Sequence, residues 1–304
     1  AQVFDATFDR TLTDGLHQAV ERLMKETATA VAGGTNIIII SDRGLSPQRA
    51  PIPSLLALSA VHQNLIREGL RTLADLVMET GEAREVHHFA MLVGFGAAAI
   101  YPYLLHDTLR ELCESGRLQL TPQEAIDRYD DAVVHGIVKI MSKMGISTVH
   151  SYEGSQIFEA VGINDQVIDR YFTNTTSRIG GLGLPELEAE ARAKHDRYLE
   201  SLRFRHDTQL ESNGEVKFRT GKEEHLYDPM TVYLLQQAVR AGDYQLFKTY
   251  TKRFNEHEIT ATLRSLLDIV TPSDRTPLPL EAVEPAREIV KRFKTGAMSY
   301  GSIS

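Results

Sequence analysis

Apolar positions near the start of the chain follow helical spacing and then give way to a continuous apolar run. A helix is predicted from Asp14, which can cap it, to about Ala32. Two glycines end this helix, and the run IIII at 37–40 predicts a buried parallel strand, because it is continuously apolar and β-branched. A helix followed by such a strand indicates an α/β fold. The helix carries its apolar face on Leu16, Val20, Leu23, Thr27 and Val31.

The alternation of helices and strands continues to about residue 184. A threonine cap, a proline and an acid at 121–124 strongly indicate the start of one further helix. We expect these elements in order: a helix from Pro53 to about Gly69, a strand at 74–80, a helix and then a short strand within 82–104, a helix at 121–144, a strand at 146–152, a short helix at 156–161 and a loop at 177–185.

From Pro185 onward the pattern becomes more polar and mostly helical. The pair Asn213-Gly214 predicts the turn of an irregular hairpin. A proline-rich connector at 271–285 interrupts the later part. Helices are predicted in this region at 186–202, 229–241, 244–254, 258–267 and 285–293.

Composition narrows the class of protein. The 304 residues are 42% apolar and 24% charged, which is typical of a soluble globular protein. The formal net charge of −8 is spread along the chain without a basic stripe, which argues against nucleic acid as a partner. Cys113 is the single cysteine, so the chain has neither an internal disulfide nor the ligands of an iron–sulfur cluster, and we expect a reducing compartment. No apolar run is long enough to cross a membrane.

The two ends of the sequence lack the features of natural termini. The segment AQVFDATF has no initiator methionine and none of the features of a signal peptide. The C-terminal segment stops directly after the motif-like stretch GAMSYGSIS at 296–304. We therefore expect an internal piece of a longer polypeptide.

Two motifs favour a structural interpretation over a chemical one. GFGAAA at 94–99 resembles a dinucleotide-binding turn, but no acid ends a second strand about 20 residues later. Close packing of small residues explains it better. His87 and His88 are adjacent on a predicted helix and point about 100° apart, so they do not form a helical zinc pair. We expect no metal there and assign them to capping or interface hydrogen bonds.

The segment Ser41-Asp42-Arg43 is the stronger candidate for a functional site. It follows an all-apolar strand, where α/β folds place functional loops. Its charges can contact a ligand, or they can pair with each other and hold the loop. The segment SRIGG at 177–181 can likewise hold an anion or order an interdomain loop. No nucleophile–base set or carboxylate pair stands out, so the residues alone indicate an α/β domain without indicating a reaction.

Several long segments, taken together and in order, resemble the large subunit of glutamate synthase. The resemblance covers nearly the whole chain. The segments that carry it are NIIIISDRG at 36–44, APIPSLLALSAVHQNLIREGLR at 50–71, ETGEAREVHHFAMLVGFGAAAIYPYL at 79–104, IVKIMSKMGISTVHSYEGSQIFEAVG at 137–162, TSRIGGLGL at 176–184 and GAMSYGSIS at 296–304.

This resemblance implies a position within a multidomain enzyme. The family's polypeptide contains an N-terminal amidotransferase domain, a central domain, an FMN-binding β/α barrel and a C-terminal β-helix. The fold implied here is an α/β, incomplete β/α-barrel-like central domain with a mostly helical C-terminal region. The central domain would span 1–285, with its α/β core at about 1–184 and the helical region at about 185–285. Residues 286–304 would begin the barrel.

Departures from the family pattern limit what the chain itself can do. The nucleophile of the family's amidotransferase is an N-terminal cysteine, whereas residue 1 here is Ala1 and Cys113 is internal; the family's iron–sulfur cysteines are also absent. Ala297, Met298 and Ser299 match positions on the first barrel strand that contact FMN in the family. A single strand cannot hold a flavin, so we expect no cofactor in the isolated chain, although the parent has FMN and an iron–sulfur cluster.

The expected role is therefore structural. The parent enzyme makes two glutamates from glutamine and 2-oxoglutarate with two electrons, and this segment docks two catalytic domains and walls the path of ammonia, without activity of its own. We expect the cytoplasm, or the plastid stroma of a photosynthetic eukaryote. The partners are the amidotransferase and barrel domains of the same polypeptide. The residues predicted to face the barrel or the channel are Ser41, Asp42, Arg43, Pro51, Ile52, Pro53 and Ser54.

Two alternatives remain open from the sequence. One is a free-standing α/β enzyme that depends on flavin. The other is an interaction module for the electron donor, either ferredoxin or a flavoprotein small subunit. Neither the donor nor the oligomeric state follows from the sequence.

Overall fold

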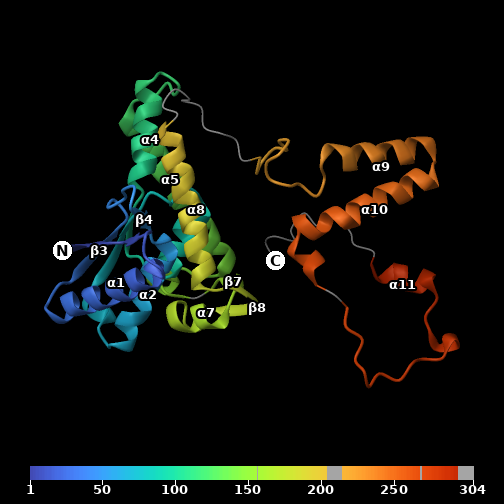
Figure 1. Cartoon of the computed structure of the whole chain (residues 1–304), viewed down its shortest axis with the longest axis horizontal. Coiled ribbons are helices and arrows are strands. Elements are labelled where there is room, and N and C mark those ends of the chain that lie inside the picture. The colour runs from blue at the N-terminus through green and yellow to red at the C-terminus, as the bar shows by residue number, and fades with distance from the viewer. Residues whose placement is uncertain (156, 204–213, 268, 294–304) are drawn as a thin grey trace. The chain divides into compact units, whose positions relative to one another are not determined.

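The structure, a computed structural model, describes residues 1–155, 157–203, 214–267 and 269–293. The chain divides into two compact units, Ala1–Arg205 and His206–Ser304, each of which is described by itself. The first unit is an α/β unit (Figure 1). Its elements are β1 (Gln2–Asp5), β2 (Thr7–Asp9), α1 (Gly15–Ala32), β3 (Ile37–Ser41), β4 (Arg49–Pro51), α2 (Ser54–Arg67), the 3₁₀ turn η1 (Arg71–Leu73), β5 (Asp75–Glu79), α3 (Val86–Gly94), β6 (Ala99–Tyr101), α4 (Tyr103–Glu114), α5 (Pro122–Met144), α6 (Val149–Tyr152), β7 (Glu159–Ile163), α7 (Asp165–Tyr171), β8 (Thr176–Leu182) and α8 (Leu184–Arg203).

A four-stranded parallel sheet organises the first unit. Its strand order is β1-β3-β5-β6, so each strand joins the same side of the sheet as the chain proceeds. Parallel connections are right-handed, and an order without reversal therefore places the connecting helices on one face. This is the arrangement of part of a β/α barrel, and it confirms the predicted α/β class.

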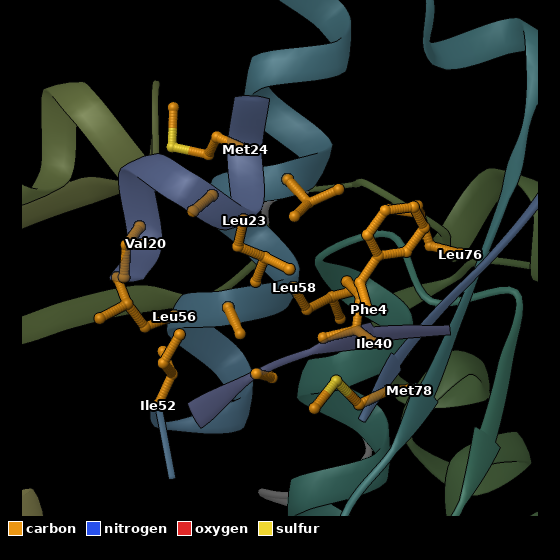
Figure 2. Packing of buried hydrophobic residues seen from close by; sticks show 14 of the residues in the cluster. Phe4, Val20, Leu23, Met24, Ile40, Ile52, Leu56, Leu58, Leu76 and Met78 are labelled. Atoms are coloured by element: carbon orange, nitrogen blue, oxygen red, sulfur yellow. The ribbon is translucent and has the colours of Figure 1, made fainter. Parts of the chain in front are cut away.

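The main hydrophobic core lies between this sheet and helices α1 and α2 (Figure 2). Residues of α3 also belong to it. Successive strand residues point to opposite faces, so alternate positions enter the core. Ile38 and Ile40 of β3 are fully buried, whereas Ile37 of the same strand is 39% exposed. The strand at 37–40 was thus predicted correctly. Its burial on both faces was predicted wrongly, because only the face of Ile38 and Ile40 is fully buried. The strand residues in the core include Phe4, Ile38, Ile40, Leu76 and Met78.

Two smaller sheets complete the first unit. Strands β2 and β4 pair antiparallel, and β7 and β8 pair parallel with register shifts. The glycines of β8 allow a close approach of its partner, because a Cβ on Gly181 would lie 2.7 Å from the carbonyl oxygen of Gly162. Helix α8 follows β8 and packs against α1 and β4 within this unit.

The sequence predictions were wrong around residues 146–182. Residues 149–152 form a helix instead of the end of a strand, and β7 lies where a short helix was expected. The segment 177–185, expected to be a loop, contains most of β8 and the start of α8. Strands β1, β2 and β4 had no counterpart among the predicted elements.

The second unit is helical in its described residues. It contains α9 (Pro229–Ala241), α10 (Tyr244–Ala261), the short turns η2 (Leu263–Leu266) and η3 (Leu280–Ala282), and α11 (Ala286–Arg292). Asp228 caps α9 by accepting the amide of Thr231 at 2.7 Å, and it also pairs with Arg253 of α10. The predicted helix at 258–267 is instead the end of α10 followed by a 3₁₀ turn. Asn213 of the predicted hairpin turn lies outside the described residues.

Candidate functional site

The carboxyl ends of β3, β5 and β6 bring together polar residues that are far apart in the sequence. Ser41 pairs in register with Glu79, and Glu79 with Tyr101. Functional loops of parallel sheets occupy this edge. Ser41 and Asp42 are buried, with 5% and 2% of their surface exposed, so the first two residues of the predicted site belong to the interior.

Asp42 is held by three hydrogen-bond donors. Its carboxylate accepts the hydroxyl of Thr80 at 2.8 Å, the amide of Gly81 at 2.9 Å and the hydroxyl of Tyr103 at 2.7 Å. Burial raises the pKa of Asp42, and these donors offset the increase only in part. Burial and the same contact raise the pKa of Tyr103, which therefore remains a donor at neutral pH. The carboxylate is fully engaged in holding three segments together.

Arg43 is fixed by a carboxylate and by two aromatic rings. Its Nε donates to Glu79 at 2.6 Å, and its guanidinium lies 4.0 Å from the ring centre of Tyr103 and 5.8 Å from that of Tyr101. Glu79 also accepts the hydroxyl of Ser41 at 2.5 Å. Partial burial acts to raise the pKa of Glu79, but the bonds from Ser41 and Arg43 outweigh it and lower that pKa. The Arg43 side chain is still 46% exposed, so it presents a fixed positive charge at the surface.

The second predicted segment, residues 51–54, is only partly accessible. Ile52 is fully buried, Ser54 is 5% exposed, and Pro51 and Pro53 are partly buried. The amide and hydroxyl of Ser54 both donate to Glu82, which therefore caps the N-terminus of α2. Proline at position 53 precedes the helix as its cap residue and does not occupy the first turn. These residues join the loop after β4 to the loop after β5.

A further ion pair extends the same edge toward β1. Arg49 donates to Asp5 at 2.6 Å and to the hydroxyl of Thr7 at 2.7 Å. Asp5 accepts the amide of Thr7 as well, at 3.0 Å. Since Asp5 lies in register with Ser41, this pair continues the polar row along the ends of the strands. We call the residues of this row and their partners the edge cluster: Asp5, Ser41, Asp42, Arg43, Arg49, Glu79, Tyr101 and Tyr103.

The contacts of the edge cluster tie its loops to one another. Its buried carboxylate is saturated by donors, and its other acids pair with arginines. In Ser41-Asp42-Arg43 the two charged residues do not pair with each other: Asp42 binds Thr80, Gly81 and Tyr103, and Arg43 binds Glu79. The sequence missed Glu79, Glu82, Tyr101 and Tyr103. The available signal was their position at or near the ends of predicted strands, where carboxyl ends meet.

The remaining motifs have structural roles. GFGAAA follows helix α3 instead of a strand, and Gly96 has φ of 109° in the turn to β6, so the dinucleotide pattern lacks its required context. His88 accepts the backbone amides of Arg84 and Glu85 at 3.3 Å, which confirms its capping role. Arg178 of the SRIGG segment lies 3.8 Å from Glu159. Ala297, Met298 and Ser299 lie outside the described residues.

The described residues contain neither a metal cluster nor a membrane span. No group of three or more His, Cys, Asp or Glu side chains in this part of the chain is placed to hold a metal ion. No helix among the same residues is long and apolar enough to cross a membrane.

The fold and the edge cluster define the class of protein: an α/β domain with an open parallel sheet whose polar loops are tied to one another. A family model described as the glutamate synthase central domain matches residues 1–164, and one described as a conserved region in glutamate synthase matches residues 225–304. The chain belongs to the glutamate synthase family.

Known relatives match the chain along its length. It is 46% identical over 304 residues to the glutamate synthase (NADPH) large chain of Bacillus subtilis, a match that covers 100% of this chain and 19% of that one. It is 41% identical over 292 residues to the glutamate synthase (NADH) of Schizosaccharomyces pombe, covering 95% and 14%. The ferredoxin-dependent glutamate synthase of Pyropia yezoensis is 38% identical over 299 residues, covering 94% and 19%. The chain thus spans less than a fifth of the length of these relatives.

Proposed function

We propose that this chain is a structural segment of a glutamate synthase, which docks the amidotransferase domain and the FMN-binding barrel and walls the path of ammonia between them. The parent enzyme makes two glutamates from glutamine and 2-oxoglutarate with two electrons. Enclosure is required because ammonia that escapes is lost to water or protonated. In this proposal the isolated chain has neither glutaminase nor synthase activity.

One observation supports the role most directly. In a chain that matches the family over its length, the polar loops at the carboxyl ends of the sheet are tied to one another, and Arg43 is held there in a fixed orientation with its side chain 46% exposed. A surface that positions two domains must be rigid, and a cluster of charge-assisted bonds supplies that rigidity. The half-exposed guanidinium is the group in the cluster best placed to contact a neighbouring domain.

The test is Arg43→Ala in the full-length enzyme. We expect glutamine hydrolysis to exceed glutamate formation, because the loops lose the cation that bridges Glu79 and the Tyr103 ring. The ratio of glutamine consumed to glutamate formed measures this coupling directly. Arg43→Lys keeps the charge but loses the planar stacking, and should give an intermediate ratio.

Arg110→Ala is the matched control. Arg110 is 44% exposed, close to the 46% of Arg43, and pairs with Asp107 within α4. Its loss should leave the coupling ratio unchanged. A ratio in Arg43→Ala equal to that of the wild type would refute the channel-facing assignment.

The colour of the purified 304-residue chain tests the flavin alternative. This chain should be colourless, whereas a free-standing flavin enzyme would be yellow.

The electron donor and the compartment belong to the parent enzyme. The three relatives are named for NADPH, NADH and ferredoxin, so membership of the family is compatible with each donor. We place the parent in the cytoplasm or the plastid stroma, with ferredoxin or a flavoprotein small subunit as its partner.

A further inference from the structure

Within the first unit, one face of the parallel sheet is poorly covered, because Val3 and Ala99 are exposed and Ile39 and Val77 are partly exposed. All-parallel sheets are normally buried on both faces, because the connecting helices pack on each. Here the strand order places helices on one face alone. The other face carries a row of apolar residues that lie side by side in register across all four strands: Val3, Ile39, Val77 and Ala99.

Exposure distinguishes the two faces of the sheet. On the helix-covered face, Phe4, Ile40 and Met78 lie in register and are 5%, 0% and 0% exposed. On the other face Val3 is 61% exposed, and Ile37, one pleat away from Ile39, is 39% exposed. We call this second surface, made of Val3, Ile37, Ile39, Val77 and Ala99, the open face.

The open face is continuous with the edge cluster. Residues 5, 41, 79 and 101 are two positions beyond the apolar row on the same strands, so their side chains project from the same face. Glu79 binds Arg43 there, and Tyr101 lies beneath the guanidinium. An apolar centre with a polar, ion-paired rim is the usual anatomy of a protein interface.

We propose that the open face is the docking surface for a part of the parent polypeptide outside residues 1–304 that presents an apolar face. This inference rests on the proposed docking role and names the surface that performs it. The length of the relatives supports this occupant, because more than four-fifths of the Bacillus subtilis chain lies outside the matched region. Exposed sheet edges and faces of this kind are otherwise sites of aggregation.

Charge disfavours a second copy of the chain as the occupant. The formal net charge is −8, so two copies repel each other.

The test uses thiol accessibility in two proteins, the 304-residue chain and the full-length enzyme. Val3→Cys and Ala99→Cys place a thiol at either end of the apolar row, and Val134→Cys is the control. Val134 on α5 is 57% exposed, close to the 61% of Val3, and lies outside the sheet. Labelling by a maleimide is followed by mass spectrometry of the peptide that carries each introduced thiol.

In the 304-residue chain, we expect both open-face thiols to react at about the rate of the control. In the full-length enzyme, we expect them to react at least about tenfold more slowly than in the 304-residue chain. Equal rates in the two proteins would overturn the proposal. Slow labelling in the 304-residue chain would also overturn it. In that case a dependence on chain concentration identifies a second copy as the cover, and independence identifies the chain's own residues.

The labelling result is separate from the coupling ratio of Arg43→Ala. Protected thiols with unchanged coupling would refute the channel role and leave the docking surface in place. Accessible thiols with lost coupling would do the reverse.

Discussion

Glu188 on α8 accepts a hydrogen bond from the backbone amide of Leu16, at the start of α1, at 3.0 Å. The two residues are 172 positions apart in the chain. Helix α1 needs this acceptor because Asp14, the predicted cap, has φ of 62° and makes no capping bond. The carboxylate of Asp14 instead lies 3.0 Å from His17. Asp14 thus occupies the predicted cap position, but its side chain makes no capping bond, and a distant glutamate supplies the acceptor.

Removing this long-range cap should destabilise the first unit. Glu188 is 7% exposed and also binds Arg192, which in turn donates to the carbonyl of Leu12 at 2.7 Å. Glu188→Ala leaves a buried amide without its acceptor and removes the carboxylate partner of Arg192, and we expect a loss of about 2–3 kcal/mol in the free energy of unfolding. Urea denaturation measures it.

Glu190→Ala is the control for this loss. Glu190 is an exposed residue of the same helix, so its removal should change the free energy of unfolding by less than about 0.5 kcal/mol. Equal stability of the two variants would show that the cap does not contribute. Glu188→Gln keeps an acceptor without the charge and should lie between them.

A second prediction concerns the turn between α3 and β6. Gly96 has φ of 109°, and a Cβ there would lie 2.2 Å from Nδ1 of His62. Gly96→Ala thus adds a clash to the backbone strain, and we expect a cost of about 3–4 kcal/mol. Gly116→Ala is the matched control, because Gly116 has φ of 71° and a Cβ there would meet open space within 4 Å. Gly116→Ala should cost about 1–2 kcal/mol. Thermal denaturation measures both losses, and equal shifts of the melting temperature in the two variants would contradict the clash.

Elements with local signals were predictable from the sequence. Thr121 accepts the amide of Glu124, and Glu124 reaches back to the amide of Thr121, as the capping box at the start of α5 predicts. The run at 37–40 forms β3 and pairs parallel, because its side chains fit a pleated, largely buried surface. In these cases the decisive contacts lie within a few residues.

Elements that depend on distant partners were not predictable. The glycines of β8 are typical of loops, and they form a strand because β7 approaches closely at Gly162 and Gly181. The candidate site shows the same limit. Its position after β3 followed from the sequence, whereas Tyr103, the partner of Asp42, lies 61 residues away. The partners of Asp42 and Arg43 could not be inferred from the neighbouring sequence.

The bond between Tyr103 and Asp42 leads to a third prediction. Tyr103→Phe removes a donor from a buried carboxylate and should cost about 1.5–3 kcal/mol. In a double-mutant cycle with Asp42→Asn, the sum of the two single-variant losses in unfolding free energy should exceed the loss of the double variant by about 1 kcal/mol. Chemical denaturation of the four proteins measures this coupling.

Tyr129→Phe is the control for the tyrosine. Its hydroxyl donates to the backbone carbonyl of Arg84 at 3.0 Å, a neutral acceptor, so the variant should lose only about 0.5–1.5 kcal/mol. Additive effects of Asp42→Asn and Tyr103→Phe would mean that the short contact carries no coupling.

Arg71 joins four segments of the first unit through one guanidinium. It donates to Nδ1 of His62 at 2.9 Å, to the carbonyls of Ala74 and Gly96 at 2.7 and 3.0 Å, and to Glu153 at 2.8 Å. Since arginine only donates, Nδ1 of His62 must be unprotonated in this arrangement. Burial, and then the charge of Arg71, lower the pKa of His62 to about 4.

This lowered pKa predicts a loss of stability in mild acid. The unfolded chain protonates His62 below about pH 6.5, whereas the folded chain does so only near pH 4. Between these values the unfolded state binds more protons, so the free energy of unfolding falls as the pH falls, by at most about 3 kcal/mol. His195, whose pKa is also lowered by burial, acts in the same direction. Asp42, whose pKa is raised, acts in the opposite direction.

Because other groups contribute to the slope, the prediction is a difference between two proteins. His62→Gln removes the titrating group and keeps an oxygen that can accept the bond from Arg71. We expect this variant to be less stable than the wild type at pH 7 and to lose about 2 kcal/mol less than the wild type between pH 6.5 and pH 4.5. Urea denaturation at several pH values measures both curves. If the two curves of unfolding free energy against pH ran parallel, His62 would take up its proton equally well in the folded and unfolded chains. The contribution of Arg71 to stability would then not require a neutral His62.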